Sequence, residues 1–416
     1  TSNHDHFMLV LQAASQSSKH QGKIGLAIAG GGPIGGMYEL GALRALEVAI
    51  DGLDLNRLDV YVGVSSGAFL AAGLVNRLST AEICQIFITN DHPEIHFSPR
   101  MFLKPAFMEF GKRVSALPGL AVDWWKSLIT DPSGSQLGEL TSRFTGAVPT
   151  GLFDNAPIEK FLKNIFTGPG RSNDFRKLEQ PLYVVAVDLD QGKAVRFGSK
   201  GWDSVPISQA VQASAALPGL YPPVDINGHH FVDGALRRTM HASVVLDHGI
   251  DLMIGINPFV PFNAKNRPKG KQAAVKLADG GLPMVLSQTF RTLLQSRMQV
   301  GLEKYARQYP ETDQLVLEPN EDDAEMFFTN VFSYSSRHRV CEHAFQSTLR
   351  DLKSRAAHLA PLLAKHSLTL NMSVLENPDI TLLDGITPVY RRTAATAQLW
   401  HNLNDIEYGL RQRKTR

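Results

Sequence analysis

The chain has 416 residues, 43% of them apolar, which is enough to bury a large core in one or two domains. Lysine and arginine number 42 against 40 for aspartate and glutamate, so overall charge gives no reason to expect a nucleic acid partner. The two cysteines, Cys84 and Cys341, exclude a disulfide framework and suit core packing. No apolar run reaches the length of a membrane span, and the N-terminus lacks the features of a signal peptide. We therefore expect a cytoplasmic protein, with peripheral membrane contact as a further expectation.

Short apolar runs bounded by turn residues predict the strands of a buried, mostly parallel sheet. In chain order these runs cover residues 23–30, 59–65, 181–190, 251–259 and 313–319. Helical periodicity lies between them, over residues 35–50 and 281–308. Because strands alternate with helices, we expect right-handed crossovers and a sheet covered by helices on both faces. The predicted fold class is α/β, with a helical insertion after the second strand and a helical C-terminal region.

A cluster of glycines follows the first predicted strand. Gly30, Gly31 and Gly32 precede Pro33, and proline suits the first position of a helix, where a missing N–H costs nothing. Bare backbone amides at a helix N-terminus favour negative charge. The cluster therefore fits a phosphate cradle or an oxyanion hole for acyl transfer, and a tight strand-to-helix turn without a ligand is the structural alternative.

The same glycines also satisfy a dinucleotide-binding pattern. Gly30, Gly32 and Gly35 match G-x-G-x-x-G after a strand, and Asp51 or Asp54 lies near the spacing expected for the carboxylate that binds the ribose. A Rossmann-like nucleotide-binding protein is therefore a competing hypothesis.

The stretch "GVSSG" follows the second predicted strand and matches G-x-S-x-G. The spacing selects Ser65 as the outward-pointing nucleophile, because Gly63 and Gly67 flank it at the positions where a side chain would crowd the backbone. Ser66 is better placed to offer its backbone N–H to an oxyanion, and its hydroxyl is assigned no role. A serine that only caps the following helix is the structural alternative.

A serine hydroxyl needs a neighbouring base to become a good nucleophile. None of the 14 histidines lies in a loop after a late predicted strand, where an α/β-hydrolase would place its histidine. The stretch "INGHHFVDGALRR" at residues 226–238 instead ends a short β-like run in Asp233, followed by Gly234 and Ala235. A carboxylate at this position can approach Ser65 directly, although Asp-Gly is also a common turn pair.

Three elements in this order, a GGG loop, a G-x-S-x-G turn and a late Asp-Gly-Ala, resemble the patatin-like phospholipase family. The stretches "QASAALPGLYPPV" (212–224) and "LYVVAVDLDQGKAVRF" (182–197) are similar to other parts of that family. The resemblance implies a catalytic dyad of Ser65 and Asp233 and an oxyanion hole built from the glycine-loop amides. It implies no metal, cofactor or catalytic histidine.

Two departures from the family pattern concern substrate choice more than reaction type. The family's glycine loop often carries Arg or Lys where this chain has Ile34. The residues after Asp-Gly-Ala are "LRRTMHAS" rather than the Asn and Pro that commonly follow. Arg237 and Arg238 in this stretch could contact an anionic headgroup or simply be exposed.

The domain organisation follows from these motifs. We expect residues 1–22 to form an N-terminal arm, residues 23–390 a patatin-like catalytic domain with its motifs in 23–260, and residues 391–416 an amphipathic basic tail. The interval from about 76 to 180 is expected to be a helical insertion. Its aromatic and basic segment at 100–129 suits an interfacial lid, or else packs on the sheet.

The favoured function is a serine lipid acyl hydrolase of the phospholipase A or lysophospholipase type, acting through an acyl-enzyme. An acyl-thioesterase or general carboxylesterase using the same dyad is the first alternative. The nucleotide-binding protein above and a non-catalytic lipid-binding protein are alternatives of another class.

Overall fold

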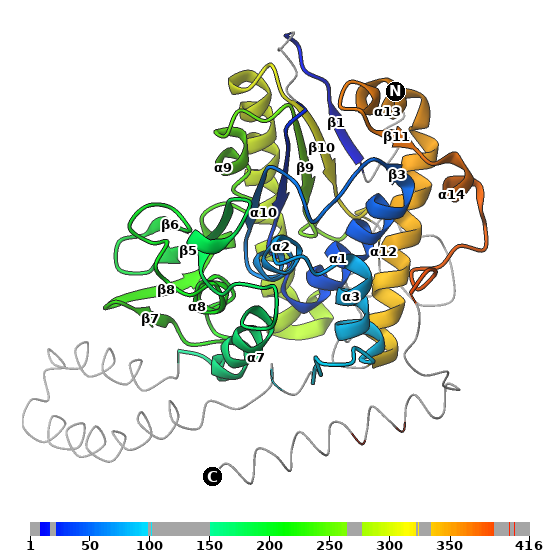
Figure 1. Ribbon diagram of the computed structural model, residues 1–416. Coiled ribbons are helices and arrows are strands. Elements are labelled where there is room, and N and C mark those ends of the chain that lie inside the picture. The colour runs from blue at the N-terminus through cyan, green and yellow to red at the C-terminus, as the bar shows by residue number, and fades with distance from the viewer. Residues whose placement is uncertain are drawn as a thin grey trace, which may run out of the picture.

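A mixed sheet of nine strands forms the centre of the protein (Figure 1). The computed structural model describes residues 9–16, 22–98, 101, 150–263, 277–321, 323, 334–386, 399 and 403. Two expectations therefore lie almost wholly outside the described residues. They are the aromatic and basic segment at 100–129 and the tail at 391–416.

Five neighbouring strands at the centre of the sheet are parallel. In spatial order they are β10 (Asp313–Leu317), β9 (Leu252–Ile256), β2 (Ile24–Ile28), β4 (Val60–Gly63) and β5 (Leu182–Asp188). Each falls within one of the predicted apolar runs. Almost every residue in them is buried, which explains why these strands read as continuous apolar runs instead of alternating ones. The prediction of an α/β fold with a mostly parallel sheet is confirmed.

The outer strands are antiparallel. In chain order they are β1 (Leu9–Gln12), which pairs with β10, β6 (Lys193–Phe197) and β8 (His229–Asp233), which both pair with β5, and β7 (Val224–Ile226), which pairs with β8. Strand β1 belongs to the expected N-terminal arm. Strand β8 runs back along β5, so its last residue, Asp233, lies opposite Ala186 of that strand.

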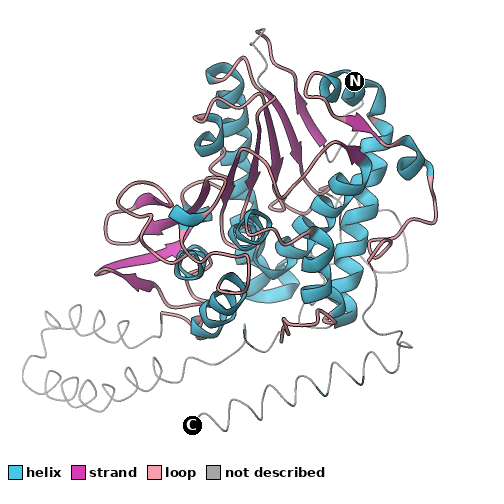
Figure 2. Ribbon diagram, in the orientation of Figure 1, coloured by secondary structure: helices cyan, strands magenta, loops and turns pink. Residues whose placement is uncertain are grey.

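Helices cover both faces of the sheet, as Figure 2 shows. Strand β2 illustrates the division, because Leu26 and Ile28 pack into one core while Ala27 and Ala29 pack into the other. The first core includes helices α1 (Gly32–Ala49), α2 (Ser66–Val75), α8 (Ile207–Ser214) and α12 (Tyr334–Ser354). The second includes α9 (Ser243–Leu246) and α10 (Gly281–Gln308).

Shorter elements complete the described chain. They are β3 (Ile50–Asp51), α3 (Thr80–Cys84), a π-helical turn (Gln85–Thr89), α7 (Ala156–Phe166), a 3-10 helix (Phe175–Lys177), a 3-10 helix (Gly234–Leu236), a 3-10 helix (Leu277–Gly280), α13 (Ala356–Ala364), β11 (Thr369–Leu370) and α14 (Met372–Glu376). No helix in the described ranges is both long and apolar enough to cross a membrane. Cys84 and Cys341 are buried and unbridged, as expected.

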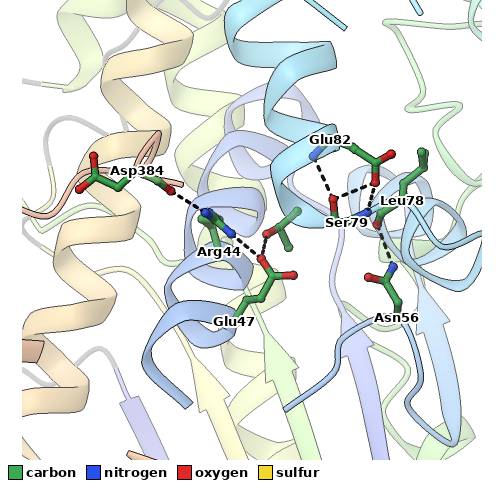
Figure 3. A network of polar contacts seen from close by, with 8 residues as sticks. Arg44, Glu47, Asn56, Leu78, Ser79, Glu82 and Asp384 are labelled. Atoms are coloured by element: carbon green, nitrogen blue, oxygen red, sulfur yellow. Dashed lines mark hydrogen bonds and ion pairs between the residues drawn. The ribbon is translucent and has the colours of Figure 1, made fainter. Parts of the chain in front are cut away.

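Helix α1, whose first turn is rich in glycine, is held by polar contacts near its C-terminal end. A buried arginine, Arg44, donates to Glu47 Oε2 at 2.7 Å and to the carbonyl of Asp384 at 2.8 Å (Figure 3). Glu47 also accepts from the Thr80 hydroxyl at the start of α3. These contacts connect α1 to α3 and to the loop near residue 384. They hold the C-terminal half of the helix, far from its glycine-rich end.

Candidate active site

Ser65 lies between β4 and α2 in a strained backbone conformation. Its φ is 52° and its ψ is −120°, a region that residues other than glycine rarely adopt. The Ser65 N–H donates to Ser214 Oγ at 2.8 Å, and that hydroxyl donates to the Val185 carbonyl at 2.6 Å. The strand-to-helix turn is therefore held from the neighbouring helix α8 and strand β5. Strain maintained in this way is typical of a functional position.

The two flanking glycines are required by close backbone contacts. A Cβ atom at Gly63 would lie 2.4 Å from the Cα atom of Ala68, and one at Gly67 would lie 2.4 Å from the carbonyl oxygen of Ala29. Neither neighbour is a flexible side chain, so a larger residue would displace the turn. The sequence prediction that side chains would crowd the backbone at these positions is confirmed.

Asp233 ends β8 with its side chain buried beside Ser65. The residue is 3% exposed, and its Oδ1 accepts the Ala235 N–H at 2.9 Å. The Ser65 side chain lies close enough to this carboxylate to lower its pKa. A Cβ atom at Gly234 would lie 2.1 Å from the carbonyl oxygen of Val185, which explains why glycine follows the aspartate. The structure thus brings together the serine and the carboxylate that sequence analysis paired.

Burial changes the acidity of this carboxyl group. Loss of solvation raises the pKa of Asp233 from 3.8 to about 6, while the hydrogen bond from Ala235 and the nearby Ser65 side chain lower it. The group is therefore still mostly ionised at neutral pH. It is also a stronger base than an ordinary aspartate, which suits a proton acceptor.

The glycine loop packs directly on Ser65. A Cβ atom at Gly30 would lie 2.9 Å from the Cβ of Ser65 and 3.4 Å from that of Ala235. A Cβ atom at Gly31 would lie 2.4 Å from the Pro258 side chain, and Gly32 has a φ of +60°. The glycines therefore let the loop approach Ser65 and Ala235, which is two residues after Asp233.

The amides near Ser65 are not equally available. The Gly30 N–H donates to the Thr239 carbonyl at 3.3 Å. For Gly31, Gly32 and Ser66, no hydrogen bond within the described part of the chain occupies the backbone N–H. Gly31 is the N-cap of α1, Gly32 is the first residue of α1 and Ser66 is the first residue of α2, so these amides lie at positive helix ends.

Glu39 is a member of this region that sequence analysis missed. Its carboxyl is fully buried in α1, and its Oε1 accepts the Ser66 hydroxyl at 3.0 Å. Burial raises the pKa of Glu39 well above its ordinary value, although the bond from Ser66 lowers it. The Ser66 hydroxyl, which had no assigned role, thus connects the first turn of α2 to α1. An acid within the apolar stretch "GGMYELGALRAL" was the available signal.

The remaining sequence candidates divide clearly. Gly35 packs against Pro258 at the start of α1, within the glycine loop. Asp51 and Asp54 instead follow the far end of α1, and an 18-residue helix is about 27 Å long. The structure therefore does not bring these acids to the glycines, which removes the geometric support for a dinucleotide site.

A histidine and two arginines follow Asp233 closely in the chain. Among the described residues, no hydrogen bond links Ser65 to a histidine. His241 is buried and its Nε2 lies 3.3 Å from the Gly234 carbonyl oxygen, and burial lowers the pKa of His241 to about 4. Arg237 and Arg238 are exposed and line an open cavity with Arg297.

The chain is thus an α/β protein whose candidate site combines a serine on a strained turn, a buried carboxylate beside it and a glycine loop packed on the serine. A sequence model of the patatin-like phospholipase family matches residues 26–246, so this chain belongs to that family. The resemblance noted from the motifs is therefore confirmed. Family membership also displaces the nucleotide-binding hypothesis.

Two solved structures similar to this chain come from bacterial proteins. VipD from Legionella pneumophila is 14% identical, with 84% of this chain and 70% of that chain covered and a TM-score of 0.36. ExoU from the type III secretion system of Pseudomonas aeruginosa, in complex with SpcU, is 16% identical, with coverage of 88% and 67% and a TM-score of 0.26. Likenesses at these TM-scores add nothing to the family assignment.

Proposed function

We propose that this protein is a serine hydrolase that cleaves carboxylic ester bonds of lipids through an acyl-enzyme on Ser65. The observation that carries the proposal is the buried pair formed by Ser65 and Asp233. One member lies on a strained turn, and the other has a pKa raised to about 6. Family membership supports a lipid substrate. Peripheral contact with a membrane and a cytoplasmic setting belong to the same proposal.

Asp233 acts as the general base in the first step. As the Ser65 hydroxyl attacks the acyl carbonyl carbon, its proton passes to the Asp233 carboxylate. The protonated Asp233 then donates this proton to the departing alcohol when the ester bond breaks. A water molecule attacks the acyl-enzyme in the second half of the reaction, with Asp233 again accepting the proton and Ser65 recovering it.

Backbone amides stabilise the oxyanion that forms in each half. We assign this role to the N–H groups of Gly31, Gly32 and Ser66, at the N-termini of α1 and α2. Gly30 is omitted because its N–H is directed to the Thr239 carbonyl. Loss of a single oxyanion donor costs about 2.7 to 4 kcal/mol in comparable sites, so these amides account for a large part of the proposed rate enhancement.

Thioesters and simple carboxylic esters present the same acyl carbonyl, so the same residues would serve them by the same steps. An activity-based fluorophosphonate probe tests the central assignment. We expect the probe to label the wild-type protein and Ser66→Ala but not Ser65→Ala, because Ser66→Ala retains the backbone N–H. Labelling that persists in Ser65→Ala would refute the nucleophile assignment. A folded wild-type protein that takes no label would favour a non-catalytic lipid-binding role.

A further inference from the structure

Three arginines gather where the chain leaves Asp233. Arg237 and Arg238 directly follow the 3-10 helix Gly234–Leu236, and Arg297 approaches from α10. The Arg297 Nη1 donates to the Leu236 carbonyl at 3.0 Å, which connects α10 to the turn after the proposed base. Together the three side chains line an open cavity of about 390 Å³, whose other walls are Val187, Gly192 and Leu236.

The positive charge of this arginine pocket is not neutralised by the described protein. The cavity lining contains no acidic residue. Within the ranges that the structure describes, no ion pair involves Arg237, Arg238 or Arg297. The one side-chain partner of Arg238 there is a neutral hydroxyl, Ser243 Oγ, at 3.3 Å. Such clustered cations attract a multiply charged anion, and guanidinium groups match the geometry of phosphate oxygens.

Buried His241 responds to the same charge. Burial is the main cause of its lowered pKa, and the positive charges of Arg238, Arg196 and Arg237 lower it further. The positive charge of Arg237 and Arg238 is therefore felt at the His241 side chain as well as in the open cavity. The glycine loop, "GGGPIGG" at residues 30–36, offers no cation of its own.

The pocket is close enough to the proposed catalytic pair for one ligand to reach both. Arg237 is four residues after Asp233, so their Cα atoms are at most about 14 Å apart, and the intervening 3-10 turn shortens this distance. In a glycerophospholipid, the phosphate is separated from the acyl esters by only a few bonds. This separation suits a ligand whose acyl ester lies at Ser65 and whose phosphate contacts the arginines.

We infer that Arg237, Arg238 and Arg297 form a subsite for the phosphate of an anionic phospholipid whose acyl ester is cleaved at Ser65. This inference rests on the proposed function and specifies its substrate class. The arginines hold the headgroup while the glycine loop receives the acyl carbonyl. They take no part in proton transfer, so they govern selection between lipids with and without phosphate.

Two short-chain lipids that differ only in the phosphate provide the test. Dihexanoyl phosphatidic acid and dihexanoylglycerol are compared as monomers, so that membrane binding does not enter the rates. We expect Arg237→Gln/Arg238→Gln to lower kcat/KM for the phosphatidic acid about tenfold or more, because hydrogen bonds to charged groups are strong. The rate with dihexanoylglycerol should change by less than about twofold. Arg297→Gln should show the same selectivity to a smaller degree, because its guanidinium also binds the Leu236 carbonyl.

A matched control is available on the same helix. Arg307 lies further along α10, where it pairs with Glu303 and is 80% exposed. Arg307→Gln should leave both rates unchanged. Equal losses on the two lipids in the pocket variants, or no loss on either, would overturn the subsite. Circular dichroism and thermal unfolding of every variant identify a general folding defect.

A binding measurement separates the subsite from the reaction. Calorimetry of Ser65→Ala with dihexanoyl phosphatidic acid should show binding that is lost when Arg237→Gln/Arg238→Gln is added. Arginine-dependent binding without hydrolysis by the wild type would refute the proposed function and support the subsite. Hydrolysis that is unaffected by the arginine substitutions would refute the subsite and support the proposed function.

Inorganic phosphate distinguishes a headgroup from a free anion. It should compete with the phosphatidic acid and leave dihexanoylglycerol hydrolysis unchanged. A changed rate on dihexanoylglycerol would instead indicate an effector site and would overturn the inference.

Discussion

Replacing Asp233 with asparagine should make the protein more stable while removing its proposed activity. The variant is nearly isosteric, and its Oδ1 can still accept the Ala235 N–H, which now meets Asp233 Oδ1 at 2.9 Å. Its Nδ2 can donate to the Ser65 hydroxyl. The change therefore removes a buried negative charge and a base, and keeps the local hydrogen bonding.

The magnitude follows from the acidity of the group. The rise in the pKa of Asp233 from 3.8 to about 6 corresponds to about 3 kcal/mol, since a tenfold change in acid dissociation is about 1.4 kcal/mol. Between these two values the folded protein binds more protons at this site than the unfolded chain does. The free energy of unfolding of the wild type therefore falls as pH rises through this window. Asparagine does not titrate, so the variant lacks this loss.

Urea denaturation of both proteins from about pH 4 to about pH 8 measures the effect. Other titrating groups are common to the two proteins and largely cancel in the difference. The unfolding free energy of Asp233→Asn should exceed that of the wild type by an amount that increases with pH. We expect this difference to grow by most of about 3 kcal/mol over the range. Ester hydrolysis should be lost at every pH. A stability difference that does not vary with pH would show that burial does not raise the pKa of Asp233.

Three further predictions concern the same region. The kcat/KM of the wild type should fall as the pH decreases below about 6, because only ionised Asp233 accepts a proton. The decrease should approach tenfold per pH unit. A kcat/KM that does not change over this pH range would contradict the role of Asp233 as the base. Gly30→Ala should reduce fluorophosphonate labelling, because the new methyl group would lie 2.9 Å from the Cβ of Ser65; full labelling would show that the loop can move aside. Glu39→Gln should retain most stability, whereas Glu39→Ala should lose about 1 to 3 kcal/mol in urea unfolding, because the Ser66 hydroxyl then loses its buried acceptor. Equal stability of the two Glu39 variants would show that this hydrogen bond contributes little.

The central sheet could be predicted because its strands are buried on both faces. Burial on both faces leaves continuous apolar runs in the sequence, and each of the five parallel strands falls within such a run. The outer strands carry weaker signals. Strand β6, "KAVRF", is mostly exposed, and its place in the sheet depends on pairing with β5. Pairing between distant segments leaves little trace in local composition.

The proposed pair at the candidate site could be predicted because local backbone geometry dictates its neighbours. Gly63, Gly67 and Gly234 are required by contacts shorter than a Cβ atom allows, so they leave a readable pattern. Partners brought in by tertiary contacts could not be read in this way. The Thr239 carbonyl accepts a hydrogen bond from the Gly30 N–H, and Arg297, on a helix far along the chain, binds the Leu236 carbonyl.

Close packing of α12 on α1 has a consequence for the nascent chain. A Cβ atom at Gly41 would lie 2.3 Å from the Cys341 carbonyl oxygen, and buried Phe345 belongs to the same core. The partner helix, Tyr334–Ser354, lies beyond the 26–246 matched by the family. When the ribosome has translated both Ser65 and Asp233, it has not yet translated α12, on which α1 packs. We expect the proposed activity to appear only after residues 334–354 have left the ribosome, because α1 lacks this packing surface until then.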